Sequence, residues 1–162
     1  MSIEKVECGA CEQNDEARPS WGPGPWSAEP ENRVEFRHAG FPCILHRGGL
    51  GAWCGYVGVP PGHPWYDQNY SEIGAQVHGG LTYGEHCGGH ICHVPELGEP
   101  EEVYWLGFDC AHAGDQPPGM TAFDYKHGLP GITGQVYRTV EYARAETEQL
   151  AEQAAAATEH PA

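Results

Sequence analysis

Glycine and proline are spread along the whole chain and constrain its fold more than any other feature. The 162 residues include 23 glycines and 14 prolines, which divide the apolar residues into short runs. Proline removes a backbone donor and glycine weakens regular structure, so this spacing favours short strands and irregular connections over long helices. The length suits one domain with a real core and is short for two. With 40% hydrophobic residues, we expect a single folded domain rich in turns.

Several apolar segments are typical of β-strands. Residues 34–47 alternate polar and apolar side chains around His-Ala-Gly, which predicts a hairpin. Further strands are predicted at 52–59, at 76–83, where glycines interrupt the pattern, and at 103–109. Residues 66–74 are expected to form one or two helical turns. Two long loops, at 84–102 and 113–131, complete this part of the chain.

One long helix is expected near the C-terminal end. Apolar residues recur there at spacings of four, three and seven, namely Val136, Val140, Ala143 and Leu150. Thr133 can cap a helix that runs from about 134 to 156 and packs on a sheet. The expected fold is therefore α+β: a small, mostly antiparallel sheet with long Gly/Pro-rich loops and one C-terminal helix. Residues 1–20 and 158–162 are expected to be disordered tails around a domain at 21–157.

The charge of the chain narrows its partners and its location. Eight basic and 23 acidic residues give a net charge of -15, which repels nucleic acid and anionic lipid. No apolar run is typical of an export signal or a membrane span, so we expect a soluble, cytoplasmic protein that binds a small molecule. In a reducing cytosol the seven cysteines are expected to be thiols, metal ligands or buried apolar groups, without a disulfide framework.

A long segment lacks permanent positive charge. Between Arg47 and Lys126 there is no lysine or arginine, although this span holds ten acidic residues, six of the ten histidines and eleven of the seventeen aromatic residues. A site built from it would need outside help to hold an anion. The help could come from a metal ion, from backbone N–H groups, or from one of four basic residues: Arg37, Arg47, Lys126 or Arg138.

A divalent metal would supply that charge. Asp109, His112 and Asp115 follow a predicted strand at intervals of three residues, and His78 lies beside two glycines. Carboxylate and imidazole groups are the ligands of hydrolytic Zn, Mn or Mg sites. We therefore predict a metal site formed by these four residues, with His63 in "PPGHP" as general acid or base.

Aromatic residues of the same span are candidates for the walls of a ligand site. Trp53, Tyr56 and Tyr83, together with Asp115, are predicted to contact the substrate. Packing in the core is the simpler interpretation of the aromatic side chains.

Other interpretations of the polar residues stay open. Asp109 could cap a turn and Asp115 could bond the nearby backbone, in a metal-free polar pocket or in a purely structural role. A structural zinc site could combine the tail motif "CGAC" with the Cys/His-rich loop, through Cys8, Cys11, Cys87 and Cys92. Catalysis by Cys54 or Cys110 is disfavoured, because both lie in apolar strands where a thiol is usually inert.

Three motifs together resemble an uncharacterised family of small proteins encoded by bacteriophages and prophages. They are "GYVGVPPGHP", "VHGGLTY" and "GFDCAHAGD", and the resemblance covers roughly residues 34–155. It implies a bacterial cytoplasm as the location but no established activity. The positions that match the family pattern are Gly62, His63, Pro64, His78, Gly79, Gly80, Asp109, Cys110, His112 and Asp115.

These observations lead to a first functional hypothesis and two alternatives. The first is a small phage-type hydrolase, assisted by a metal, that acts on a small phosphorylated or nucleotide-like molecule. The second is a protein that sequesters a nucleotide signal without turnover. The third is a structural or partner-binding phage protein. The sequence does not indicate the ligand, the metal or the oligomeric state.

Overall fold

A computed structural model describes residues 17–87, 91–129 and 134–159. Five strands form one sheet in the order β1-β2-β3-β5-β4, and all neighbouring strands are antiparallel. Their bounds are β1 Arg33–His38, β2 Phe41–Arg47, β3 Trp53–Val59, β4 Tyr83–His86 and β5 Tyr104–Asp109. The predicted hairpin and the predicted strands at 52–59 and 103–109 are confirmed.

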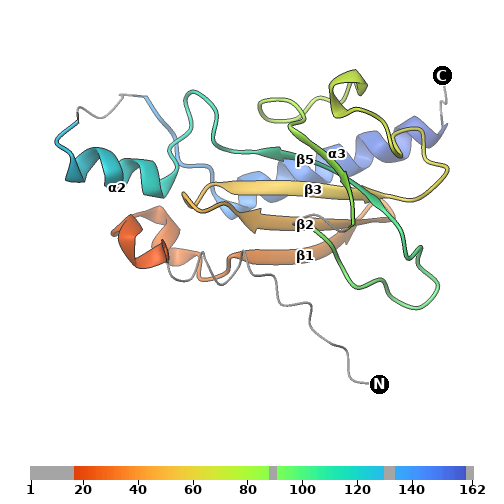
Figure 1. The fold of residues 1–162 in the computed structure, drawn as a ribbon, viewed down its shortest axis with the longest axis horizontal. Helices are drawn as coiled ribbons and strands as arrows, with labels where there is room; N and C mark the ends of the chain where they lie inside the picture. The colour runs from red at the N-terminus through yellow and green to blue at the C-terminus, as the bar shows by residue number, and fades with distance from the viewer. Residues whose placement is uncertain (1–16, 88–90, 130–133, 160–162) are drawn as a thin grey trace.

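The helices are unequal in length. They are the 3-10 helices η1 Arg18–Trp21, η2 Pro25–Ala28 and η3 Tyr70–Glu72, and the α-helices α2 Pro118–Lys126 and α3 Val140–Glu159. In Figure 1, α3 runs along one face of the sheet, whereas α2 lies at one end beside η1. The predicted α+β class, an antiparallel sheet with a C-terminal helix, is confirmed.

The two faces of the sheet are covered differently because side chains alternate along each strand. The face under α3 carries the larger core, in which Leu106 and Phe108 of β5 pack with Leu150 of the helix. The other face carries a smaller cluster, in which Ile44 and Trp105 pack with residues from the chain around 91–103. The sheet is therefore buried on both sides, by a helix and by a loop.

Three local expectations were wrong. Residues 118–126, expected in a loop, form α2, which has Pro118 at its first position, where the missing N–H costs nothing. Residues 76–82, expected in a strand, form a turn and irregular chain before β4. Helix α3 begins at Val140 rather than near 134, because Val136 pairs with Asp115 in an isolated β-bridge instead of joining the helix.

The packed chain also begins earlier than the predicted boundary at residue 21. Arg18 donates hydrogen bonds to Asn32 Oδ1 and to the Trp26 carbonyl oxygen, and Trp21 is buried. Residues 17–20 thus belong to the domain. The rest of the predicted tail, residues 1–16, lies outside the described residues, as do residues 160–162.

One pair of cysteines does not follow the expectation of free thiols. Cys87 and Cys92 form a disulfide with Cα atoms 4.9 Å apart. These two sulfurs were candidates for the structural zinc site, whose other candidates, Cys8 and Cys11, lie outside the described residues. Among the helices that the structure describes, none has the length and apolarity required to cross a bilayer.

The contact between α3 and β3 depends on a glycine, which generates the first prediction. A Cβ at Gly55 would overlap with Thr147 of α3 and with the ring of Phe108. Gly55→Ala is therefore expected to lower the free energy of unfolding by about 1–3 kcal/mol, as measured by urea denaturation. Gly74→Ala is the control, since a Cβ there meets no atom within 4 Å. Equal stability of the two variants would contradict this packing.

Candidate functional site

His78 is the centre of a hydrogen-bonded relay between the chain that follows β5 and α3. Its Nε2 lies 2.7 Å from Asp115 Oδ2, and its Nδ1 lies 2.7 Å from the Tyr142 hydroxyl. An ionised carboxylate only accepts hydrogen bonds, so Nε2 donates to Asp115 and Nδ1 of the neutral ring accepts from Tyr142. The backbone N–H of His78 also donates to Glu146, one turn further along α3. The relay runs from a buried carboxylate to a phenol.

Asp115 is the anchor of this relay and is only 2% exposed. Its Oδ1 accepts a hydrogen bond of 2.9 Å from Arg138 Nε, and its Oδ2 also accepts one of 3.0 Å from the backbone N–H of His112. Burial alone would raise the pKa of Asp115, but the hydrogen bonds from His78, Arg138 and His112 outweigh burial and hold this pKa below its usual 3.8. Asp115 is therefore a carboxylate at neutral pH.

Backbone pairing explains why Arg138 reaches Asp115. The N–H of Gln116 donates to the carbonyl oxygen of Val136, and the N–H of Val136 donates to that of Gly114. These two bonds align the chain before α3 with the chain after β5. Arg138 lies outside the span between Arg47 and Lys126, which holds no lysine or arginine. It therefore brings to Asp115 a positive charge that this span lacks.

A second acid-histidine pair lies beside the first. His112 Nε2 is 3.3 Å from Asp109 Oδ1, slightly longer than a usual hydrogen bond, and both side chains are about one-third exposed. The rings of His78 and His112 are 6.0 Å apart between centroids. Gly79 makes this approach possible, because its φ is +68° and a Cβ there would overlap with the His112 ring. Two imidazoles, each with its own carboxylate, therefore face one another.

The turn around Asp109 also matches part of the structural interpretation. Asp109 Oδ1 accepts a hydrogen bond of 3.0 Å from the backbone N–H of Ala111, and Oδ2 accepts one of 3.0 Å from Thr82 Oγ1. The carboxylate therefore stabilises the end of β5 through both oxygens, and only Oδ1 also lies near His112.

His63 lies outside this group, contrary to its predicted place in one pocket with the others. It is 7% exposed, its Nε2 is 2.8 Å from the Ala154 carbonyl oxygen, and its Nδ1 accepts from the N–H of Trp65. Burial lowers the pKa of His63, although the bond to Ala154 opposes this shift. Nε2 holds the proline-rich loop against α3 and Nδ1 stabilises the turn within that loop, so the ring serves the fold here.

The predicted aromatic walls are core residues to different degrees. Trp53 is 1% exposed, and Arg47 Cζ lies 4.6 Å from the centroid of the Trp53 ring. Trp53 is therefore a core residue rather than part of a ligand site. Tyr56 is 9% exposed and meets Tyr83 edge to face at 5.1 Å between centroids. Both tyrosines pack with the smaller core, on the sheet face away from α3.

The predicted metal site does not fit this geometry. His78 uses both ring nitrogens for Asp115 and Tyr142, and a guanidinium occupies Asp115 Oδ1. In residues 17–87, 91–129 and 134–159, no group of three or more His, Cys, Asp and Glu side chains is arranged to hold a metal ion. His78, Asp109, His112 and Asp115 are neighbours, but as one hydrogen-bonded pair, His78 with Asp115, and one looser contact of 3.3 Å between His112 and Asp109.

Two free thiols of the described chain, Cys43 and Cys110, are buried and Cys54 is half-buried, which matches the interpretation as apolar groups. Burial raises the pKa of Cys43 to about 12 and that of Cys54 to about 11, and it also raises the pKa of Cys110. Such thiols are not ionised at neutral pH and are weak nucleophiles.

Sequence reasoning missed two residues of the site. Neither Tyr142 nor Glu146 is among the site residues that the sequence predicts. Arg138, Tyr142 and Glu146 follow one another at intervals of four residues, which is the signal in the sequence. Residues four apart lie on the same side of a helix, so Tyr142 and Glu146 project together from α3, and Tyr142 also packs against the larger core.

Comparisons with protein-family models, with curated proteins and with solved structures give no match for this chain. The resemblance to a phage and prophage family therefore stays a prediction, and the site must be interpreted from its own chemistry.

The Asp115 relay predicts a pH-dependent stability. Because the pKa of Asp115 is lower in the folded protein than its usual 3.8, its stabilisation is complete above that value and is lost as the pH falls through the folded pKa. Asp115→Asn should cost about 3 kcal/mol at neutral pH, as expected for breaking a buried pair. Denaturation at about pH 7, 5 and 3 should show the difference from wild type narrowing only at the lowest pH.

Asp67→Asn is the matched control, since Asp67 pairs with His86 on the surface and its side chain is 71% exposed. This variant should unfold like the wild type, as exposed pairs contribute little. An Asp115→Asn protein as stable as the control at neutral pH would contradict the anchoring role.

Proposed function

We propose that the chain is a small hydrolase that acts on a phosphorylated or nucleotide-like molecule at the paired histidines. The observation that carries this proposal is that His78 and His112, each beside a carboxylate, stand 6.0 Å apart between ring centroids. One general acid and one general base on either side of a reacting group are what hydrolysis of an ester requires.

The Asp115 relay is suited to accept a proton. Water that attacks the phosphorus atom gives its proton to the Tyr142 oxygen while the Tyr142 proton moves to His78 Nδ1. The resulting imidazolium is stabilised by the Asp115 carboxylate, which accepts from Nε2 at 2.7 Å. Because burial and the nearby Glu146 raise the pKa of Tyr142, the phenol keeps its proton in the resting site and can pass it along the relay.

His112 is suited to the opposite role. Its one-third exposed ring can meet a ligand, and Asp109 beside Nε2 favours a proton on that nitrogen, so the second exchangeable proton is carried on Nδ1. Protonated His112 then gives that proton to the leaving oxygen. One imidazole gains a proton and the other loses one, and exchange with solvent restores both.

Arg138 is suited to hold the anionic group. Only its Nε bonds to Asp115, and its two terminal nitrogens make no hydrogen bond with the described residues. Its guanidinium also stacks on the Tyr142 ring, 4.7 Å from the centroid, which fixes its position. Arginine binds phosphate oxygens through parallel N–H groups, so Arg138 can bind the phosphoryl group beside the relay.

Substitutions of the two histidines test the function. The purified protein is incubated with p-nitrophenyl phosphate, bis-p-nitrophenyl phosphate and a panel of nucleotides and cyclic nucleotides, while product and intact ligand are followed separately. His78→Gln and His112→Gln should each lower kcat about 100-fold or more, as for loss of a general acid or base. His86→Gln, in the exposed pair with Asp67, should leave the rate unchanged.

Two further outcomes have clear meanings. EDTA should not change the rate, since the relay uses protons and an arginine. If EDTA inhibits the protein and Zn, Mn or Mg reverses the inhibition, the predicted metal-assisted mechanism replaces the relay. Capture of about one ligand per protein chain, with intact release on denaturation, would replace the hydrolase by the sequestering protein. No turnover on the whole panel would also contradict the hydrolase.

A further inference from the structure

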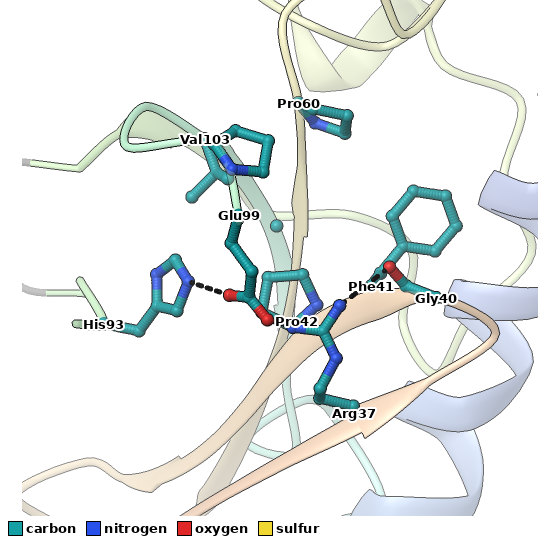
Figure 2. Close-up of a pocket in the computed structure, with 10 residues that line it drawn as sticks. Arg37, Gly40, Phe41, Pro42, Pro60, His93, Glu99 and Val103 are labelled. Atoms are coloured by element: carbon teal, nitrogen blue, oxygen red, sulfur yellow. Dashed lines mark hydrogen bonds and ion pairs between the residues drawn. The ribbon is translucent and has the colours of Figure 1, made fainter. Parts of the chain in front are cut away.

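A second group of polar side chains lines a cavity away from the histidine pair. Two adjoining cavities of about 70 and 290 Å³ share Arg37, Pro42, His93 and Glu99. They lie where the β1–β2 hairpin meets the chain that covers the smaller core (Figure 2). Their combined size suits a small organic molecule rather than a large cofactor.

His93 is the unusual residue of this cavity. Its side chain is 10% exposed, and neither ring nitrogen has a hydrogen-bond partner within the described parts of the chain. The nearest carboxylate oxygen, Glu99 Oε2, is 3.6 Å from Nε2, too far for a hydrogen bond. Figure 2 shows the ring directed at Glu99 across the cavity. A buried polar group without a partner is costly, and it calls for a ligand that supplies one.

The protonation of His93 determines which partner it needs. Burial lowers the pKa of His93; Glu35 opposes this shift, and Arg37 and Arg33 add to it. The neutral ring has one nitrogen that accepts a hydrogen bond. The accepting nitrogen and the Glu99 carboxylate, whose Oε2 lies 3.6 Å from Nε2, are two acceptors in one cavity, which a ligand with two N–H groups can bridge.

The charge around the cavity favours a cation. Glu35, Glu96 and Glu99 line the larger part, against Arg37 alone. Glu99 is paired with Arg37, and Glu35 with Arg33 at 2.6 Å, whereas Glu96 forms no ion pair with the described residues. Glu96, which is exposed to solvent, is thus left without a counter-charge at the rim of the cavity. An anionic ligand would meet net negative charge.

The rest of the lining is apolar and can hold a ring or a short chain. In the smaller cavity it includes Phe41, Pro42, Pro60, Pro100 and Val103. Proline and aromatic faces pack well against a flat apolar body. The cavity thus offers an apolar wall on one side and acceptors on the other.

We infer that this cavity binds a small organic cation whose N–H groups bridge His93 and Glu99 and whose apolar body packs on the proline-rich wall. Amidinium, guanidinium and primary ammonium groups all have this donor chemistry. The site is separate from the paired histidines, and its ligand has the opposite charge to the substrate proposed there.

Three probes of the same shape and different charge test the inference. Benzamidine, benzamide and benzoate are titrated into ¹⁵N-labelled protein while the ring signals of His93 are followed by NMR. Benzamidine should bind saturably and shift these signals, benzamide should bind at least tenfold more weakly, and benzoate should not bind. His93→Phe and Glu99→Gln should each weaken benzamidine binding at least tenfold.

His38→Phe is the matched control, because His38 also pairs with a glutamate, Glu152, and does not line the cavity. It should bind benzamidine like the wild type. Glu99→Gln keeps the shape of the side chain, so it decides the matter if His93→Phe does not fold. The inference is overturned if benzamidine does not bind saturably, if benzamide binds as tightly as benzamidine, or if Glu99→Gln binds benzamidine like the wild type.

Discussion

One buried carboxylate, that of Glu29, connects the segments on which the paired-histidine site depends. It forms an ion pair of 2.6 Å with Arg47, whose side chain is fully buried at the end of β2. It also accepts a hydrogen bond from the Tyr137 hydroxyl and one of 2.6 Å from the backbone N–H of Val140, the first residue of α3. A negative charge at a helix N-terminus is favourable, and a buried ion pair is tolerated only when such extra bonds satisfy it. The N-terminal segment, the sheet and the start of α3 are thereby held together.

The chemistry of the site follows from that placement. Arg138 and Tyr142 stand on either side of Val140 in the sequence, so the position of the helix start determines where a guanidinium and a phenol meet His78. Asp115 then accepts a hydrogen bond from Arg138 on Oδ1 and one from His78 on Oδ2. These bonds keep the buried carboxylate ionised, and the ionised carboxylate requires His78 to donate through Nε2. In a chain of net charge -15, one arginine brought in from outside the acidic span changes what that span can bind.

Much of the fold follows from local pattern. Alternation and β-branched or aromatic content indicate the strands at 34–47, 52–59 and 103–109, and the apolar spacing indicates the C-terminal helix, because these periods reflect which faces become buried. Helix α2 was missed because prolines and glycines dominate its surroundings, although Pro118 at its first position is compatible with a helix. Residues 76–82 have the alternation of a strand, but β5 pairs with β4 at Tyr83–His86 instead, a choice that depends on partners distant in sequence.

The sequence by itself determined that acidic and imidazole groups gather after β5 and near the glycines at 79 and 80, since residue types and spacing are local properties. Only the tertiary structure decided their pairing. A bridge between Asp115 and Val136 brings Arg138 to a carboxylate that spacing alone had assigned to a metal, and the packing of α3 brings Tyr142 to His78. The same packing takes His63 away, since its ring bonds to Ala154 at the far part of the helix. Such contacts join segments tens of residues apart, and no local pattern encodes them, because each depends on how the buried faces fit together.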